Sequence, residues 1–248
     1  MSRIIAAFGA YAFFLSDLVR ATFRYGVSWD EVLSEGYQIG VKSLSILLII
    51  NIFVGSNLAI QGYNAMEPLG GQRLVGMFVA LAGVRELAPI IAAAMVAAKA
   101  GTEMASQIGV MRIGQQIDAL EVMAINPYAT LIAPRMLGIM MVMPALTLIA
   151  VFTTLASGYV VSVHQLGLNG AVYIEFAAGS IQLVDFLYCE IKALMFGLII
   201  CTLSCWFGFN CKKGPEGVGE ATNRAVVSSA VACVVVNYFI SEMLYGGL

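Results

Sequence analysis

Long stretches without a charged side chain constrain this sequence more than any other feature. The first covers Ser43 to Met66, which contains no Asp, Glu, Lys or Arg. A helix rises about 1.5 Å per residue, so about 20 apolar residues cross the roughly 30 Å of hydrocarbon in a bilayer. Over the whole chain 60% of residues are hydrophobic and 11% are charged, whereas a soluble domain carries about 25% charged residues. The chain is therefore expected to be an integral membrane protein.

The apolar runs predict an all-α protein with about five transmembrane helices, an N-terminal interfacial helix and a cytoplasmic coupling helix. Residues 28–31, Ser-Trp-Asp-Glu, have the spacing of a capping box, which predicts the start of the helix that leads into the first span. The expected spans are residues 43–64, 74–98, 136–162, 186–209 and 225–241.

The N-terminus combines one arginine and an apolar run with Asp17, Arg20 and Arg24 further on. No small-residue cleavage site follows the run, as a signal peptide would require. We predict that residues 3–25 form a helix along the membrane surface, with its aromatic side chains dipping into lipid. A first true span is the alternative. The expected organisation is an interfacial segment, residues 1–27, followed by a permease domain, residues 28–248.

Basic residues are distributed unevenly between the two sides of this topology. With the N-terminus in the cytoplasm, only Arg73 lies in an outer loop, and the outer connection 164–182 has no Lys or Arg. Such a bias predicts this orientation, with Gly246-Gly247-Leu248 at the outer, periplasmic side. The basic residues expected inside are Arg3, Arg20, Arg24, Lys42, Lys99, Arg112, Arg135, Lys212, Lys213 and Arg224.

Composition excludes several kinds of chemistry. His164 is the only histidine, which excludes a multi-histidine metal site or bis-histidine haem ligation in one chain. The five cysteines form no Cys-x-x-Cys pair, and most lie in apolar runs as packing residues do. No Gly-x-x-x-x-Gly-Lys-Ser/Thr loop occurs, so this chain is not expected to hydrolyse ATP. The glycine-rich segment 214–222 is interpreted as a turn. We expect no catalytic residue, metal or cofactor in the chain.

One polar segment, Ile113 to Arg135, separates the second and third runs. An amphipathic helix is predicted over about 111–125, because residues at about 100° spacing divide into two faces. The apolar face is Ile113, Ile117, Leu120 and Ala124, and the polar face is Gln115, Asp118 and Glu121. The helix should end before Pro127. Periodicity leaves two interpretations open: a surface connector, or a docking helix whose apolar face enters a groove in a cytoplasmic partner.

Three charged residues, Arg85, Glu86 and Lys192, lie within apolar runs. A charge near the bilayer centre costs about 3 kcal/mol on insertion scales, so these side chains should face a cavity or a partner helix. They either brace helix packing or meet the phosphate of a lipid headgroup. Neighbours in sequence cannot face each other on a helix, so Arg85 and Glu86 should reach different helices. Candidates for acyl-chain contact, by residue type only, are Phe53, Leu58, Met77, Met140 and Met143, for which ordinary packing is favoured.

Residues 85–135 resemble the MlaE/YrbE permeases, the membrane subunits of ABC transporters that work with MCE proteins. The family pattern is Arg-Glu-Leu-x-Pro in the second span, a small-residue run and a Gly-x-Met segment. A Gln-Ile-Asp-Ala-Leu-Glu-Val-Met coupling helix follows, then Asn-Pro and Pro-Arg, and all of these occur here in order. The glycine-rich turn is also similar, although Pro215 stands where alanine is usual. The resemblance extends from about Ser28 to Tyr238.

The resemblance implies a non-catalytic lipid permease of the bacterial inner membrane. Its cargo would be phospholipids or related lipids, moved between the inner and outer membranes. The implied partners are a second copy of the chain, an MlaF-like ATPase that binds ATP and Mg, an MlaD-like MCE-ring protein and, as an optional member, a small STAS-type subunit. The residues implied to occupy the ATPase groove are Gln115, Gln116, Ile117, Asp118, Leu120, Glu121 and Met123. Arg85, Glu86 and Lys192 would lie near the lipid path at the dimer interface.

Two other classes of function compete with this interpretation. In a stand-alone secondary transporter or channel, Glu86, Glu190 and Lys192 would form a proton relay. That class leaves the coupling helix without a purpose, and the inverted repeats frequent in such carriers are not visible. A membrane enzyme is disfavoured because the sequence shows no set of nucleophile, base and acid.

Overall fold

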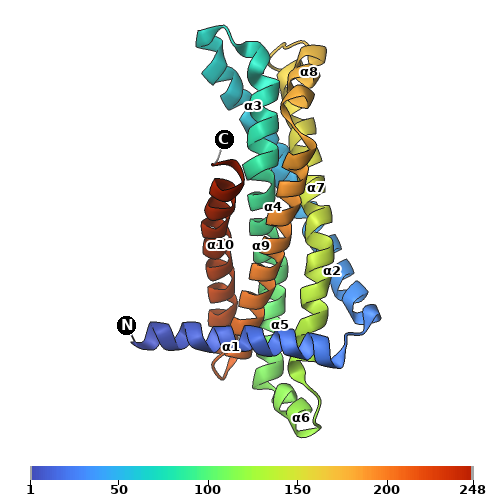
Figure 1. Cartoon of the computed structure of the whole chain (residues 1–248), viewed down its shortest axis with the longest axis vertical. Helices are drawn as coiled ribbons and strands as arrows, with labels where there is room; N and C mark the ends of the chain where they lie inside the picture. The colour runs from blue at the N-terminus through green and yellow to red at the C-terminus, as the bar shows by residue number, and fades with distance from the viewer. Residues whose placement is uncertain (1, 247–248) are drawn as a thin grey trace. The chain divides into compact units, whose positions relative to one another are not determined.

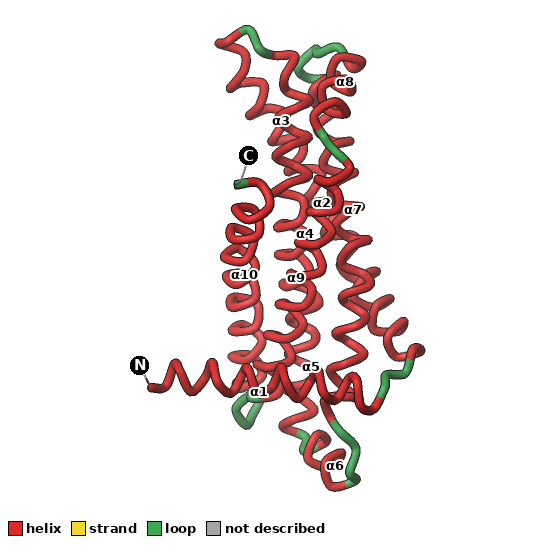
Figure 2. The backbone as a smooth tube through the Cα atoms, viewed as in Figure 1, coloured by secondary structure: helices red, strands yellow, loops and turns green. Residues whose placement is uncertain are grey.

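The computed structural model describes residues 2–246, apart from the side chains of residues 2–8, 23 and 25. Every regular element in this range is a helix (Figures 1 and 2). The chain divides into two compact units. Unit 1 comprises Met1–Lys42, Val96–Val142 and Phe196–Ala232, and unit 2 comprises Ser43–Met95, Met143–Met195 and Cys233–Leu248. Gly247 and Leu248, expected at the outer side, lie outside the described residues.

Five helical stretches of the described residues are long and apolar enough to cross a membrane, which confirms the predicted helical membrane fold. They are Trp29–Leu69, Gln72–Ile113, Tyr128–His164, Leu183–Phe209 and Pro215–Tyr245. The corresponding α-helices are α2 (Trp29–Met66), the series α3 (Val75–Ala82), α4 (Ala88–Val96) and α5 (Thr102–Ile113), then α7 (Ala133–His164), α9 (Leu183–Phe209) and α10 (Pro215–Tyr245). The stretches are longer than the expected spans because helical hydrogen bonding continues beyond the apolar run.

Short non-α turns occur along three of these stretches. The 3-10 turns η1 (Glu67–Leu69) and η2 (Gln72–Leu74) flank the connection from α2 to α3. Three segments are π-helical: η3 (Gly83–Leu87), η4 (Ala97–Gly101) and η5 (Tyr128–Ile132). Such segments are rare and frequently occur at functional sites. Two of them carry charges that the sequence places in or beside an apolar run, because η3 contains Arg85 and Glu86 and η4 contains Lys99.

Helix α1 (Ser2–Tyr25) is not one of the five stretches. Phe14 is buried, and its ring lies 5.2 Å from that of Trp206 and 5.6 Å from that of Tyr128. The Tyr11 hydroxyl donates to Thr202 Oγ1 at 2.7 Å, whereas Phe13 is 73% exposed. Figure 1 shows α1 running crosswise to the end of α9 in the same unit. Two unlike faces are what a surface-lying helix requires, and the interfacial location stays a prediction.

Helices α2 and α7 approach closely in unit 2. A Cβ atom at Gly55 would collide with the Thr154 carbonyl oxygen and the Ser157 hydroxyl. One turn away, Asn51 is buried and its Oδ1 accepts from Thr154 Oγ1 at 3.1 Å. The Asn51 amide also donates to the Leu47 carbonyl at 2.8 Å. A small residue beside an interhelical hydrogen bond is the packing that membrane helices favour.

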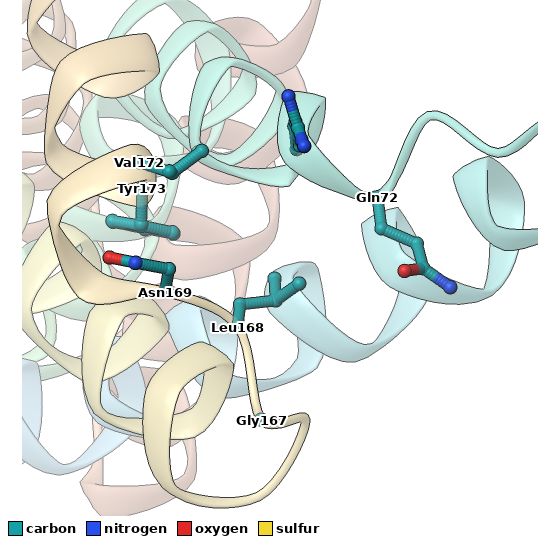
Figure 3. A pocket seen from close by; sticks show the side chains of 8 residues that line it. Gln72, Gly167, Leu168, Asn169, Val172 and Tyr173 are labelled. Atoms are coloured by element: carbon teal, nitrogen blue, oxygen red, sulfur yellow. The ribbon is translucent and has the colours of Figure 1, made fainter.

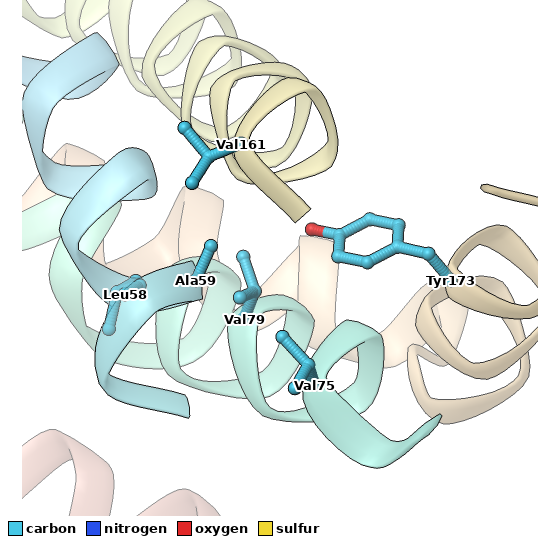
Figure 4. Packing of buried hydrophobic residues seen from close by; sticks show 6 residues of the cluster. All are labelled: Leu58, Ala59, Val75, Val79, Val161 and Tyr173. Atoms are coloured by element: carbon cyan, nitrogen blue, oxygen red, sulfur yellow. The ribbon is translucent and has the colours of Figure 1, made fainter. Parts of the chain in front are cut away.

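A cluster of buried apolar side chains joins four helices of unit 2, including α8 (Gly170–Ser180). Its members are Leu58, Ala59, Val75, Val79, Val161 and Tyr173. Figure 4 shows the ring of Tyr173 pointing toward the helices that carry Val79 and Val161. Burial raises the pKa of Tyr173 to about 12, so this phenol stays neutral at physiological pH. The cluster fixes α8 against α3.

The Gly55→Ala variant is expected to be less stable, because the added methyl group overpacks the crossing with α7. Overpacking costs about 1–3 kcal/mol, which corresponds to a melting temperature lower by about 5 °C. Gly179→Ala in α8 is the matched control, since a Cβ there would meet no heavy atom within 4 Å. Thermal unfolding of the purified protein in detergent compares the two. Equal melting temperatures for both variants would contradict a close approach at Gly55.

Candidate functional site

Lys192 of α9 is fully buried although it lies in a membrane-spanning stretch. Its Nζ donates to the Arg85 carbonyl at 2.7 Å, to Glu86 Oε1 at 3.1 Å and to Ser241 Oγ at 2.6 Å. An ammonium group has three donors, and all three are used. Such complete pairing is the condition under which a buried charge is tolerated.

Pro89 explains why the Arg85 carbonyl is free to accept from Lys192. In an α-helix that carbonyl would bond the N–H of the residue four positions further on, which is Pro89. Proline has no N–H, and a buried carbonyl without a partner costs free energy. Lys192 donates to this carbonyl, which is one of the three acceptors that hold the lysine.

The Glu86 carboxylate accepts hydrogen bonds from two side chains of α10. Its Oε1 accepts from Ser241 Oγ at 2.6 Å as well as from Lys192, and its Oε2 accepts from Asn237 Nδ2 at 2.7 Å. Asn237 and Ser241 are four residues apart, so they lie on one face of the helix. The Glu86 carboxylate is thereby fixed between α9 and α10, while 41% of the side chain stays exposed.

Arg85 has different partners from Glu86, but both side chains contact α9 and α10, so the prediction that they reach different helices is wrong. The Arg85 Nε forms a 2.9 Å ion pair with Asp185 Oδ1 at the start of α9, and its guanidinium lies over the ring of Tyr245 at 4.7 Å. Asp185 is buried and also accepts from the Gln182 backbone N–H at 2.9 Å. The two basic groups, Arg85 and Lys192, thus balance the two carboxylates Glu86 and Asp185.

The structure brings Arg85, Glu86 and Lys192 together in what we call the charged cluster, which also contains Asp185, Asn237 and Ser241. Lys192 has no exposed surface, so it braces the cluster, and Arg85 and Glu86 present the accessible groups. Sequence analysis missed Asp185, Asn237 and Ser241. Two weak signals for them are present in the sequence. Asp185 is a charged residue directly before the fourth apolar run, and Asn237 and Ser241 are polar residues four positions apart near the end of the fifth.

An apolar groove of about 390 Å³ lies along α2 in the same unit. Leu87 and Ile91 form the side opposite α2, and carbon atoms make up nearly all of the lining. The α2 residues in the groove are Ile50, Phe53, Val54, Asn57, Leu58 and Gln61. Since Leu87 follows Glu86 directly, η3 contributes to both the groove and the charged cluster. The arrangement can accept an acyl chain beside a charged headgroup region.

The five residues named as candidates for acyl-chain contact lie in different environments in the structure. Phe53 and Leu58 line the groove, whereas Met143 is completely buried as a packing residue. Met77 and Met140 lie outside the groove lining. Glu190, the proton-relay candidate, has no hydrogen bond to Glu86 or Lys192 in the described part of the chain, and its buried Oε1 has no partner there.

A second hollow of about 380 Å³ lies where α3 and α8 begin. Figure 3 shows Gln72 on one side and Leu168 and Asn169 on the other. The Asn169 side chain caps α8 by accepting from the Ala171 N–H at 2.9 Å. The lining mixes polar and apolar atoms, so it suits an acyl chain less well than the groove along α2.

The predicted helix over about 111–125 is divided in the structure. Helix α5 ends at Ile113, and a separate short helix, α6 (Gln116–Val122), follows. Gln115 and Ala124, on either side of α6, have φ of 57°, a left-handed conformation that turns the chain. Non-glycine residues adopt it uncommonly. The prediction of one continuous helix is therefore wrong, whereas the predicted polar residues Gln115, Asp118 and Glu121 are exposed.

Within α6 the predicted apolar residues Ile117 and Leu120 are the least exposed, and Ala124 beyond its end is exposed. Ile117 is completely buried against its own unit, so it cannot serve as a docking anchor in this conformation. Asp118 forms an ion pair with Arg112. Val122 is 88% exposed and Met123 is 60% exposed. These two residues form an accessible apolar surface at the C-terminal end of α6, beside the exposed Glu121. Sequence analysis did not single out Val122.

No group of three His, Cys, Asp or Glu side chains in the described residues is arranged to hold a metal ion. The fold and site define a multi-pass helical membrane protein in which η3 contributes residues to both a charged cluster and an apolar groove. The chain belongs to the MlaE permease family, because the model of this family, described as Permease MlaE, matches residues 32–243.

Individual relatives agree with this assignment. The chain is 32% identical to a probable ABC transporter permease protein of Rickettsia conorii, over 96% of this chain and 92% of the relative. It is 28% identical to the intermembrane phospholipid transport system permease protein MlaE of Haemophilus influenzae, over 87% and 83%. It is 32% identical to the chloroplastic protein TRIGALACTOSYLDIACYLGLYCEROL 1 of Arabidopsis thaliana, over 89% and 63%.

Proposed function

We propose that this chain is the membrane permease subunit of an MCE-associated ABC transporter that moves phospholipids or related lipids between the inner and outer membranes. The observation that carries the proposal is that η3 contributes residues to both an apolar groove and a charged cluster. A phospholipid needs both environments at once. The family membership and the phospholipid transport named for the Haemophilus relative support the same substrate class.

Within this proposal the charged residues have different roles. Arg85 is the group that meets lipid phosphate, since its guanidinium is partly exposed and planar donors suit phosphate oxygens. Lys192 is a positioning residue that holds the Arg85 backbone and the Glu86 carboxylate. Phe53 and Leu58 contact the acyl chain in the groove. A homodimer interface at this site would enclose the lipid between two copies.

Energy for transport comes from a partner in this proposal. The bias of basic residues supports a cytoplasmic N-terminus and a cytoplasmic α6. There its exposed end would enter a groove of an MlaF-like ATPase, which binds ATP and Mg, so that this chain needs no cofactor. An MlaD-like ring protein would meet the outer side of the inner membrane, and a small STAS-type subunit is an optional addition.

Reconstitution tests the proposed function. The chain is purified with its co-expressed ATPase, and transfer of fluorescent phospholipid from the proteoliposomes to acceptor vesicles is followed. We expect the ATPase to co-purify and transfer to require ATP. Proteoliposomes with an ATPase that lacks its phosphate-loop lysine are the control. Equal transfer without nucleotide would overturn the proposal and favour a secondary transporter.

A further inference from the structure

Two lysines lie where apolar runs end on neighbouring helices. Lys42 directly precedes the uncharged run that starts at Ser43, and Lys99 directly follows the run that ends at residue 98. Lys42 forms a 2.5 Å ion pair with Glu103 of α5, so the two ends lie side by side in unit 1. Because the apolar runs mark the hydrocarbon, both lysines lie at the depth of the lipid headgroups.

A hollow of about 540 Å³ lies between these two lysines. That volume is within the range of sites that hold small molecules. The polar lining residues are Lys42, Lys99, Thr102, Glu103, Ser106 and Gln107. Two lysines against one glutamate leave a net charge of +1 (2 − 1). This hollow shares no residue with the charged cluster or with the groove along α2.

Lys99 is the lysine of this hollow that has no carboxylate partner among the described residues. It is exposed and makes no ion pair with any described residue, whereas Lys42 is paired with Glu103. The Ser106 hydroxyl also makes no hydrogen bond within the described part of the chain, and the Thr102 hydroxyl donates to the Ala98 carbonyl at 2.7 Å. A free ammonium beside a free hydroxyl offers two donors to an incoming anion.

The π-helical segment η4 fixes the direction of Lys99. Gly101 lies against α9, since a Cβ there would be 2.9 Å from Ser204 Oγ. Residues two positions apart point to nearly opposite sides of a helix, so Lys99 projects away from the face that packs on α9. The packing of Gly101 on α9 therefore holds the backbone that carries the Lys99 side chain.

We propose that this hollow binds the phosphate of an anionic phospholipid in the leaflet on the α6 side of the membrane. The net positive charge, the headgroup depth and the free donors of Lys99 and Ser106 favour this occupant. The inference goes beyond the proposed function, because binding at this rim does not depend on whether the bound lipid is carried. It assigns the chain a second lipid site, separate from the transport path.

Equilibrium binding without nucleotide tests the site. Short-chain phosphatidylglycerol is titrated into the purified protein, with its co-purifying subunits, and adducts are measured by native mass spectrometry. Lys99→Gln should weaken binding about fivefold, the contribution of one lysine at an anionic membrane surface. Lys99→Arg should restore binding. The matched control is Lys213→Gln, another exposed lysine without an ion pair among the described residues, which should leave the affinity unchanged.

Three results would overturn the assignment. Unchanged affinity in Lys99→Gln removes the site, and an equal loss in Lys213→Gln reduces it to general surface charge. Displacement of the lipid by excess inorganic phosphate would assign the hollow to a soluble anion instead. Because no nucleotide is present, a failure here is separate from a failure of ATP-driven transfer, which would contradict the proposed function alone.

Discussion

Glu86→Ala is expected to abolish lipid transfer and to lower the free energy of unfolding by about 3–5 kcal/mol. The change leaves the Lys192 ammonium completely buried without a carboxylate, and breaking a buried pair by removing one partner carries a penalty of about this size. Ser241 and Asn237 would also lose their acceptor. Thermal or denaturant unfolding in detergent, combined with the ATP-driven transfer assay, measures both effects.

Two further variants separate the structural and transport roles of the cluster. Ser241→Ala removes one hydroxyl and should cost only about 1 kcal/mol. The double variant Glu86→Gln, Lys192→Met removes both charges and should recover much of the stability, because it leaves no unpaired buried charge. We expect transfer to stay lost in the double variant. Recovery of stability and transfer together would show that the cluster acts only as a brace.

Val122→Asp is expected to release the ATPase from the permease. Val122 is 88% exposed at the end of α6, so the folded chain loses no packing when it is replaced. A charge at the centre of an apolar contact should weaken association by more than about 2 kcal/mol, or about 30-fold. Co-purification of the tagged permease with its ATPase provides the measurement.

Leu69→Asp is the matched control for this effect. Leu69 is 80% exposed in η1, in the other unit of the chain, and undergoes the same chemical change. We expect it to retain the ATPase. If Val122→Asp also retains it, or if both variants lose it, α6 is not the coupling element. Asp118 is a poorer test, because its replacement also breaks the ion pair with Arg112 that links α6 to α5.

The sequence by itself determined the class of this protein. A bilayer requires apolar helices of about 20 residues, so the apolar runs were enough to predict the five stretches of the described residues that are long and apolar enough to cross a membrane. It also identified Arg85, Glu86 and Lys192, because charges inside such runs are costly and rarely occur without a role. Their individual partners depend on contacts between residues up to 155 positions apart, as for Glu86 and Ser241.

Only the tertiary structure decided how these residues act. Lys192 is buried and donates to the Arg85 carbonyl and to Ser241, and this arrangement depends on the packing of α9 against η3 and α10. Gln115 and Ala124 adopt left-handed conformations on either side of α6, in which Ile117 is buried and Val122 is exposed. Neither residue type signals such a turn, since propensities describe local averages, whereas a buried partner and a backbone reversal arise from the assembled fold.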